Sequence, residues 1–105
     1  MFEETKYRSL FIEHQIALND GVVINYAEAG KGKTLLMVHG LANNWANWIP
    51  LAKYLISDYR VIMVDLPGFG KSSRLKKYSL ASAGDYLQEF VDEMKLEVDA
   101  VVGNS

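Results

Sequence analysis

Apolar residues are arranged along the chain in patterns that predict a series of strands. Residues 10–18 partly alternate between apolar and polar positions, as a half-buried strand does. The Asn-Asp-Gly sequence at 19–21 predicts a tight turn, and residues 22–27 form the returning strand of an antiparallel hairpin. Residues 35–38 and 61–64 are short and continuously apolar, which is typical of parallel strands buried on both faces.

Two further segments have the spacing of amphipathic helices, and a short strand follows them. The apolar positions of the first helix are Trp48, Leu51, Ala52 and Leu55. Those of the second helix are Leu80, Ala83, Leu87, Val91 and Met94. We expect Asn47 to cap the first helix, with Pro50 in its first turn, and Ser79 to cap the second. Residues 98–102 form the last strand.

The order of these elements is a hairpin followed by β-α-β-α-β, which predicts an α/β fold. Alternating strands and helices indicate parallel strands joined by right-handed crossovers. Ligands in open α/β sheets bind outside the carboxyl ends of the strands. Three polar segments follow predicted strands there, at 39–40, 65–73 and 103–105.

The composition of the chain excludes several classes of protein but does not identify its function. A chain of 105 residues forms one small domain, and a net charge of −2 gives no reason to expect nucleic acid or an anionic membrane as a partner. There are no cysteines, which excludes disulfides and thiolate catalysis. The first residues lack the apolar region of a secretory signal, and no apolar run reaches the length of a membrane-spanning helix. The default expectation is therefore a cytoplasmic protein.

The segments that follow the three strands resemble motifs of a known superfamily. Gly103-Asn104-Ser105 is similar to the first half of G-x-S-x-G, in which a sharp turn exposes a serine hydroxyl above the sheet. Together with LLMVHGLANNWANW and VIMVDLPGFGKS, in this order and spacing, it resembles the α/β-hydrolase superfamily from about residue 10 onward. The blocks are similar to a branch that includes carboxylesterases, lactonases, cofactor-free haloperoxidases and carbon–carbon bond hydrolases. Residues 1–105 would then be the N-terminal portion of such a domain, with an incomplete sheet.

This resemblance implies a role for each residue of the motifs. Ser105 would be the nucleophile, and the backbone N–H of Leu41, or alternatively Ala42, would be an oxyanion donor. Positioning roles are implied for His39, Gly40, Gly103 and Asn104. Such an enzyme acts on a small-molecule ester or similar acyl substrate and uses neither a cofactor nor a metal. Asn104 replaces the histidine that is commonest in the family, which tilts the expectation slightly toward carbon–carbon hydrolysis, while Ser105 argues against the relatives with an aspartate nucleophile.

The order of catalytic residues in this family is serine, then Asp or Glu, then histidine. Both remaining catalytic residues would thus lie beyond residue 105, because His14 and His39, the two histidines of the chain, precede the serine. We therefore expect the 105-residue chain to be inactive alone. We also expect Trp48 to pack in the core, whereas Trp45 and Phe69 are equally compatible with core packing and with lining a pocket.

Two alternatives belong to different functional classes. Residues 27–34 read AEAGKGKT and fit a relaxed P-loop, with the acidic segment at 65–68 as the Mg²⁺-handling strand end of a nucleotide-binding module. A P-loop must open a helix, however, and the residues after Thr34 have a strand pattern. The other alternative is a non-enzymatic half of a split hydrolase, which binds a complementing C-terminal half.

Overall fold

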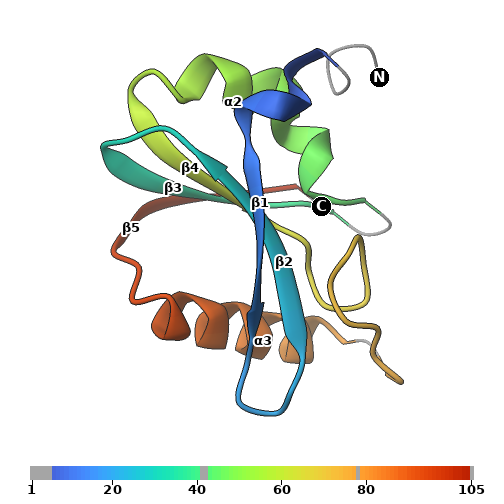
Figure 1. Ribbon diagram of the computed structural model, residues 1–105. Coiled ribbons are helices and arrows are strands. Elements are labelled where there is room, and N and C mark those ends of the chain that lie inside the picture. The colour runs from blue at the N-terminus through green and yellow to red at the C-terminus, as the bar shows by residue number, and fades with distance from the viewer. Residues whose placement is uncertain (1–5, 41–42, 78, 105) are drawn as a thin grey trace.

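Five strands form one mixed sheet in the computed structural model, which describes residues 6–40, 43–77 and 79–104 (Figure 1). The strands are β1 (Ile12–Ala17), β2 (Val23–Ala29), β3 (Lys33–Val38), β4 (Tyr59–Val64) and β5 (Val98–Gly103). The α-helices are α2 (Ile49–Leu55) and α3 (Leu80–Glu93), and two 3₁₀ turns are η1 (Arg8–Leu10) and η2 (Trp45–Trp48). The order in the sheet is β1-β2-β4-β3-β5.

The pairing confirms the predicted hairpin and the parallel β-α-β-α-β unit. Strands β1 and β2 are antiparallel, and β2 also pairs antiparallel with β4. Strand β3 lies between β4 and β5 and is parallel to both. In the hairpin turn only Gly21 takes a positive φ, of 87°, and its N–H donates to Leu18 O at 2.9 Å. The fold is thus that of an incomplete N-terminal part of an α/β domain, as expected.

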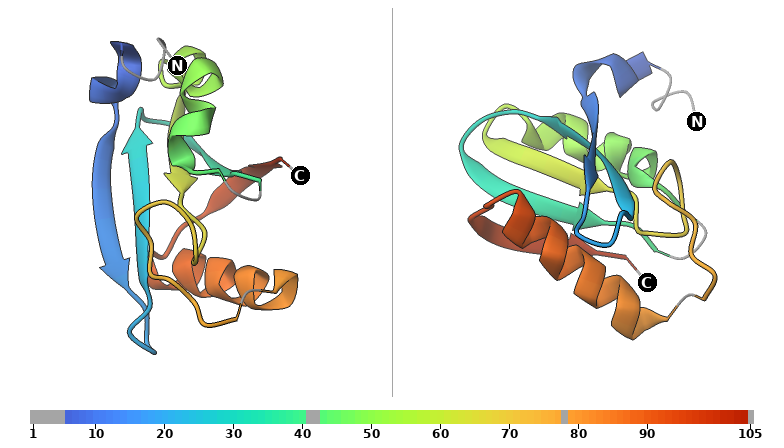
Figure 2. Two further views of the ribbon diagram at one scale, coloured as in Figure 1. Left: turned by 90° about the vertical axis from the view of Figure 1, so that its right-hand side faces the viewer. Right: turned by 60° about the horizontal axis from the view of Figure 1, so that its bottom comes forward.

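Strand β4 is buried on both faces because α2 and α3 cover opposite sides of the sheet (Figure 2). Val61 and Met63 belong to the apolar cluster beneath η2 and α2, whereas Ile62 and Val64 belong to the cluster beneath α3. All four side chains are at most 1% exposed. A strand with two buried faces needs apolar residues at every position, which explains the continuous apolar run in the sequence.

The first helical segment begins earlier than its sequence pattern predicts. Asn44 caps the 3₁₀ turn η2: Asn44 Oδ1 accepts from Ala46 N at 2.9 Å, and Asn47 Oδ1 accepts from Asn44 N at 3.1 Å. The prediction that Asn47 caps the α-helix is wrong, because α2 follows η2 directly, with Trp48 at its N-cap and no side-chain bond there. Leu51, which the predicted apolar stripe placed toward the core, is 45% exposed, while Ala52 is buried as expected.

The second helix confirms its predicted cap but not the whole of its predicted stripe. Ser79 Oγ accepts from Ser82 N at 3.0 Å and caps α3. Ala83 is buried and Phe90 is completely buried, but Leu80 is 80% exposed. The periodicity identified the correct face of the helix without showing how much of that face meets the sheet.

The structure contradicts the P-loop alternative. Thr34 is the second residue of β3, so the sequence GKGKT leads into a strand and not into a helix whose N–H groups could bind phosphate. Gly30 and Gly32 have φ values of 88° and 118°, and a Cβ at Gly30 would lie 2.0 Å from Tyr59 O. The two glycines are therefore explained by a close passage of backbone against backbone.

Within the described part of the chain, no helix has the length and apolar character needed to cross a membrane.

Candidate active site

The ends of the three parallel strands meet at one edge of the sheet. Val38 is in register with Val64 of β4 and with Gly103 of β5. Asn104 N continues this contact by donating to Val38 O at 3.2 Å. The segments that begin at His39, Asp65 and Asn104 therefore leave the sheet side by side (Figure 1). The predicted nucleophile Ser105 and the predicted oxyanion donors Leu41 and Ala42 lie outside the described residues.

His39 is a buried residue that is fully engaged with backbone groups. Its side chain is 3% exposed, its Nε2 accepts from Leu66 N at 2.9 Å, and its Nδ1 lies 2.7 Å from Gly40 O. Because Nε2 accepts from Leu66 N, Nδ1 is the ring nitrogen that donates to Gly40 O. Phe69 packs edge-on against the ring, with centroids 5.7 Å apart. No ring nitrogen is left to act as a base.

Asp65 directly follows β4 and is buried with three hydrogen-bond donors around its carboxylate. Oδ1 accepts from Trp45 N at 2.7 Å, and Oδ2 accepts from Asn25 Nδ2 and from Lys71 N, each at 2.9 Å. The residue is 1% exposed. A Cβ at Gly70, where φ is 53°, would lie 2.3 Å from the carboxyl group, so the turn can close around Asp65 only with glycine there.

Glu13 of β1 joins the same polar cluster from the hairpin side. Its Oε1 accepts from Trp45 Nε1 at 2.8 Å and from Asn25 Nδ2 at 3.4 Å, and its Oε2 accepts from Lys71 Nζ at 2.9 Å. Arg8 lies 3.6 Å from Oε1 and stacks its guanidinium 4.7 Å from the centre of the Trp45 ring. Partial burial alone would raise the pKa of Glu13, but the bonds from Lys71, Trp45 and Asn25 outweigh it and lower that pKa.

Trp45 belongs to the core, which answers the question left open by the sequence. It is 1% exposed and packs with Phe11, whose ring centroid lies 6.0 Å away. Trp48 is partly buried and packs against the same cluster, as predicted. Phe69 is also partly buried and lies against His39, at the strand-end edge.

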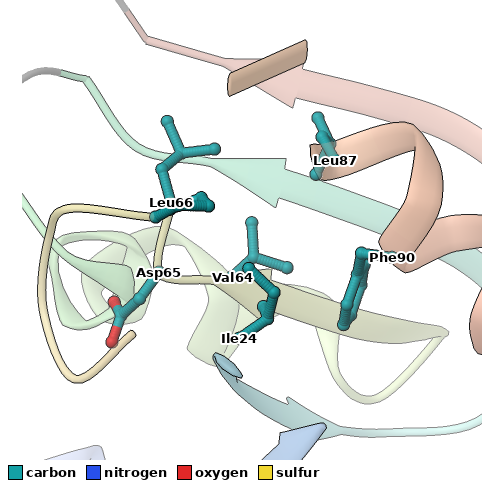
Figure 3. A pocket seen from close by; sticks show the side chains of 7 residues that line it. Ile24, Val64, Asp65, Leu66, Leu87 and Phe90 are labelled. Carbon is teal, nitrogen blue, oxygen red and sulfur yellow. The ribbon is translucent and has the colours of Figure 1, made fainter. Parts of the chain in front are cut away.

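An apolar crevice lies beside Asp65 on the α3 side of the sheet (Figure 3). Its walls include Ile24, Val64, Leu66, Leu87 and Phe90, and it has no volume open to water. Figure 3 shows the carboxylate of Asp65 pointing away from this group. The crevice is therefore tight core packing rather than a place for substrate.

Gly103 and Asn104 are both exposed. Gly103 does not take a positive φ, and a Cβ placed on it would meet no heavy atom within 4 Å. Among the described residues, then, no contact requires glycine at this position. The steric need that the elbow motif implies for Gly103 remains a prediction.

The sequence did not identify Glu13 and Asn25 as members of the cluster beside the strand ends. Asn25 is 1% exposed and lies in the middle of a run of apolar residues. Its position in that run could have identified it, because a polar amide in a buried strand needs hydrogen-bond partners. Glu13 occupies an ordinary polar position of an alternating strand and carries no such signal.

Known proteins share both the sequence and the fold of this chain. Residues 33–105 match the family model described as alpha/beta hydrolase fold. The dihydrolipoyllysine-residue acetyltransferase component of the acetoin cleaving system of Cupriavidus necator is 38% identical over 94 residues, or 88% of this chain and 25% of its own length. The 2-hydroxy-6-oxo-6-(2'-aminophenyl)hexa-2,4-dienoic acid hydrolase of Metapseudomonas resinovorans is 33% identical over 108 residues, or 95% of this chain and 36% of its own.

A solved structure extends the similarity from sequence to fold. The crystal structure of a membrane phospholipase A superposes with a TM-score of 0.87 at 28% identity, and the match covers 97% of this chain and 36% of that one. The chain thus spans between 25% and 36% of the length of these three proteins. Since the family model matches well over half of its residues, the chain belongs to the α/β-hydrolase family.

Proposed function

We propose that this chain is the N-terminal portion of a serine hydrolase that cleaves a small-molecule ester or similar acyl substrate, with Ser105 as the nucleophile. One observation carries the proposal: Asn104 N donates to Val38 O, so the residue before Ser105 is held beside the strand that leads into His39 and Gly40. A nucleophile and an oxyanion loop must be neighbours in this way, because both act on one carbonyl group.

The reaction that fits this arrangement is acyl transfer to serine. A histidine takes the proton of the Ser105 hydroxyl, the oxygen attacks the carbonyl carbon, and the leaving group departs with that proton. The negative oxygen formed on the way is stabilised by backbone N–H groups, one of them from Leu41 or, alternatively, Ala42. Water then attacks the acyl-enzyme, releases the acid and restores the serine.

Neither histidine of the chain is suited to be that base. His39 uses both ring nitrogens in buried hydrogen bonds. His14 lies on β1, at the hairpin edge of the sheet, and its Nε2 is 3.7 Å from Glu28 Oε1. We therefore propose that residues 1–105 alone do not turn over esters, and that the acid and the base are supplied by a complementing C-terminal half.

The unpartnered side of β5 supports a complementing half of this kind. β5 pairs with β3, and no other described strand pairs with it. Val101 is 61% exposed, and a groove of about 220 Å³ between β5 and α3 is lined mainly by apolar side chains, among them Leu36, Leu87, Val91 and Val98. A further strand and helix would cover this apolar surface, as the faces of a parallel sheet require.

The names of the similar proteins support the class of reaction. Two of the three are named as a hydrolase and a phospholipase, and the third as an acetyltransferase component. These names cover hydrolysis and acyl transfer, the two classes of reaction that the proposal draws on. They differ in substrate, so the proposal extends to the ester or acyl class and no further.

The test is covalent labelling of the full-length protein encoded by the reading frame that contains this chain. A fluorophosphonate probe should react with wild-type protein, and mass spectrometry should locate the adduct on Ser105. Ser105→Ala should abolish both the label and the hydrolysis of p-nitrophenyl acetate. The matched control is Ser57→Ala, at an exposed serine in the turn after α2, which should retain both. A label on another serine, or turnover that survives Ser105→Ala, would refute the proposal.

A further inference from the structure

Two consecutive residues that directly follow β4, Asp65 and Leu66, hold both ends of the segment that follows β3. At the start of the segment, Leu66 N donates to His39 Nε2 at 2.9 Å. At its end, Trp45 N donates to Asp65 Oδ1 at 2.7 Å. We call His39 and Trp45 the two fixed points of this segment. The residues predicted to carry the oxyanion donors lie between them in the sequence. The residues that follow β4 therefore set where the segment begins and where it ends.

Both fixed points are buried, which makes the hydrogen bonds strong and excludes water as a competitor. His39, Trp45 and Asp65 are 3%, 1% and 1% exposed. The bond to Asp65 is made to a charged acceptor and is short, as charge-assisted bonds are. In a buried environment such a bond constrains geometry more tightly than it would in water.

The Asp65 carboxylate is itself prevented from turning. Its second oxygen accepts from Asn25 Nδ2 and Lys71 N, so donors approach it from β2 and from the following turn. The carboxylate is in addition close to the backbone of Gly70, where no side chain could be accommodated. The orientation of the carboxylate is thus fixed by bonds from η2, from β2 and from the turn after β4. A carboxylate that cannot turn also fixes the position of the Trp45 N–H that donates to it.

We propose that Asp65 is a positioning residue for the oxyanion hole, acting through the backbone of Trp45 without touching the substrate. This inference rests on the proposed function, because it needs the segment after Gly40 to supply an oxyanion donor. Donors work only within a few tenths of an ångström of the developing oxyanion, and a misplacement of 1 Å costs roughly 100-fold in rate. Asp65 would therefore influence turnover rather than ordinary substrate binding.

A direct catalytic role for Asp65 does not fit its surroundings. The carboxylate is occupied by three donors and almost completely buried. A general base must reach the proton that it abstracts, within hydrogen-bond distance in a plausible substrate pose. Held in this way, Asp65 can orient a neighbour but cannot exchange protons with a substrate.

The first test follows backbone amide exchange by NMR in the 105-residue chain, which requires no catalysis. In wild type, Trp45 N–H and Leu66 N–H should exchange at least about tenfold more slowly than unstructured amides do, because both bonds are buried. Asp65→Asn should weaken the protection of Trp45, because the single amide oxygen satisfies more donors when it faces Asn25 Nδ2 and Lys71 N, and the NH₂ group then faces the Trp45 N–H. The matched control, Asp85→Asn on the exposed side of α3, should leave the Trp45 amide unchanged.

The second test measures kcat and KM in the full-length protein. Asp65→Asn should lower kcat by about 10- to 100-fold and leave KM within about twofold, because ground-state binding does not use the misplaced donor. Asp85→Asn should leave both constants unchanged. Wild-type kcat in Asp65→Asn, or an effect on KM alone, would overturn the inference while leaving Ser105 labelling, and so the proposed function, intact.

The wild-type exchange measurement tests the inference even if Asp65→Asn fails to fold. If Trp45 N–H and Leu66 N–H exchange as fast as unstructured amides in the wild-type protein, the two fixed points do not exist and the inference is wrong whatever Asp65→Asn does. If they are protected but turnover survives Ser105→Ala, the proposed function is wrong, and with it the catalytic part of the inference. Glu13→Gln weakens the bonds that Glu13 accepts from the Trp45 indole, Lys71 and Asn25 but leaves the bond from Trp45 N to Asp65 in place, so it should lower kcat less than Asp65→Asn.

Discussion

Replacing Gly70 by alanine should unfold the turn around Asp65, and the structure allows the size of the effect to be worked out. The new Cβ would lie 2.3 Å from both Cγ and Oδ2 of Asp65, well inside van der Waals contact. A carboxylate on a free side chain could turn away at little cost. Here it cannot, because donors from Trp45, Asn25 and Lys71 hold it where it is.

The expected loss has two parts. A non-glycine residue at φ 53° costs about 1–2 kcal/mol, since the left-handed region crowds the Cβ. Moving the carboxylate breaks at least two of its hydrogen bonds, and bonds to charged groups contribute about 1.5–3 kcal/mol each, or about 3–6 kcal/mol together. The sum is about 4–8 kcal/mol, which is comparable with the roughly 5–15 kcal/mol by which a whole domain is stable.

Gly21→Ala is the matched control, because Gly21 also has a positive φ but a Cβ there would meet nothing within 4 Å. It should lose only the conformational part, about 1–2 kcal/mol. Urea unfolding followed by tryptophan fluorescence gives the free energy of unfolding for both variants, with Trp45 reporting directly on the neighbourhood of Asp65. If Gly70→Ala lies within about 1 kcal/mol of Gly21→Ala, the carboxylate is not held as described, and the reasoning fails.

Three further predictions use the same titration. Phe90→Ala should cost about 3–5 kcal/mol because its ring is completely buried, whereas Leu80→Ala, which is 80% exposed, should stay within about 0.5 kcal/mol; equal losses would contradict the assigned face of α3. Asn44→Ala should cost about 1 kcal/mol through the lost cap of η2, and an unchanged midpoint would argue against that cap. The pKa of Glu13 is lowered in the folded state by its bonds to Lys71 and other donors, so its contribution is present above pH 4.5 and lost as the pH falls. The difference between wild type and Glu13→Gln should therefore shrink on acidification, and a difference that grows would contradict the shift.

The sheet was predictable because the pattern of apolar residues differs between strands that bury one face and strands that bury two. The runs at 35–38 and 61–64 are too short for helices and so favour strands with two covered faces, and the Asn-Asp-Gly sequence favours a hairpin turn. The cap of the first helix was misplaced because Asn44 and Asn47 are chemically identical and three residues apart. The position of the 3₁₀ turn decides between them, because the turn begins at Trp45, so that Asn44 precedes it and Asn47 lies inside it.

The candidate site was predictable only where short motifs carry it. His39, Asp65 and Asn104 follow apolar strands, so their common edge could be inferred from the topology. The hydrogen bond between Asp65 and Trp45 could not be inferred. Its donor is a backbone N–H, which every residue except proline has, so the sequence carries no sign of it. Glu13 was missed for a related reason: its partners come from other elements, and their approach depends on the tertiary fold.

The order of strands in the sheet has a consequence for synthesis on the ribosome. β3 follows β2 in the chain, but β2 pairs with β4. During synthesis, the free edge of β2 therefore stays unpaired until β4 has been made. The roughly 30 residues between the end of β2 and the start of β4 take about 2–6 seconds to translate at roughly 5–20 residues per second. During that interval the nascent hairpin exposes an open edge, where pairing with another chain is a hazard. Asn25 and Glu28 place polar side chains on the strand with this unpaired edge, which disfavours pairing with another chain. In the finished fold the same two residues bond to Asp65 and Arg60.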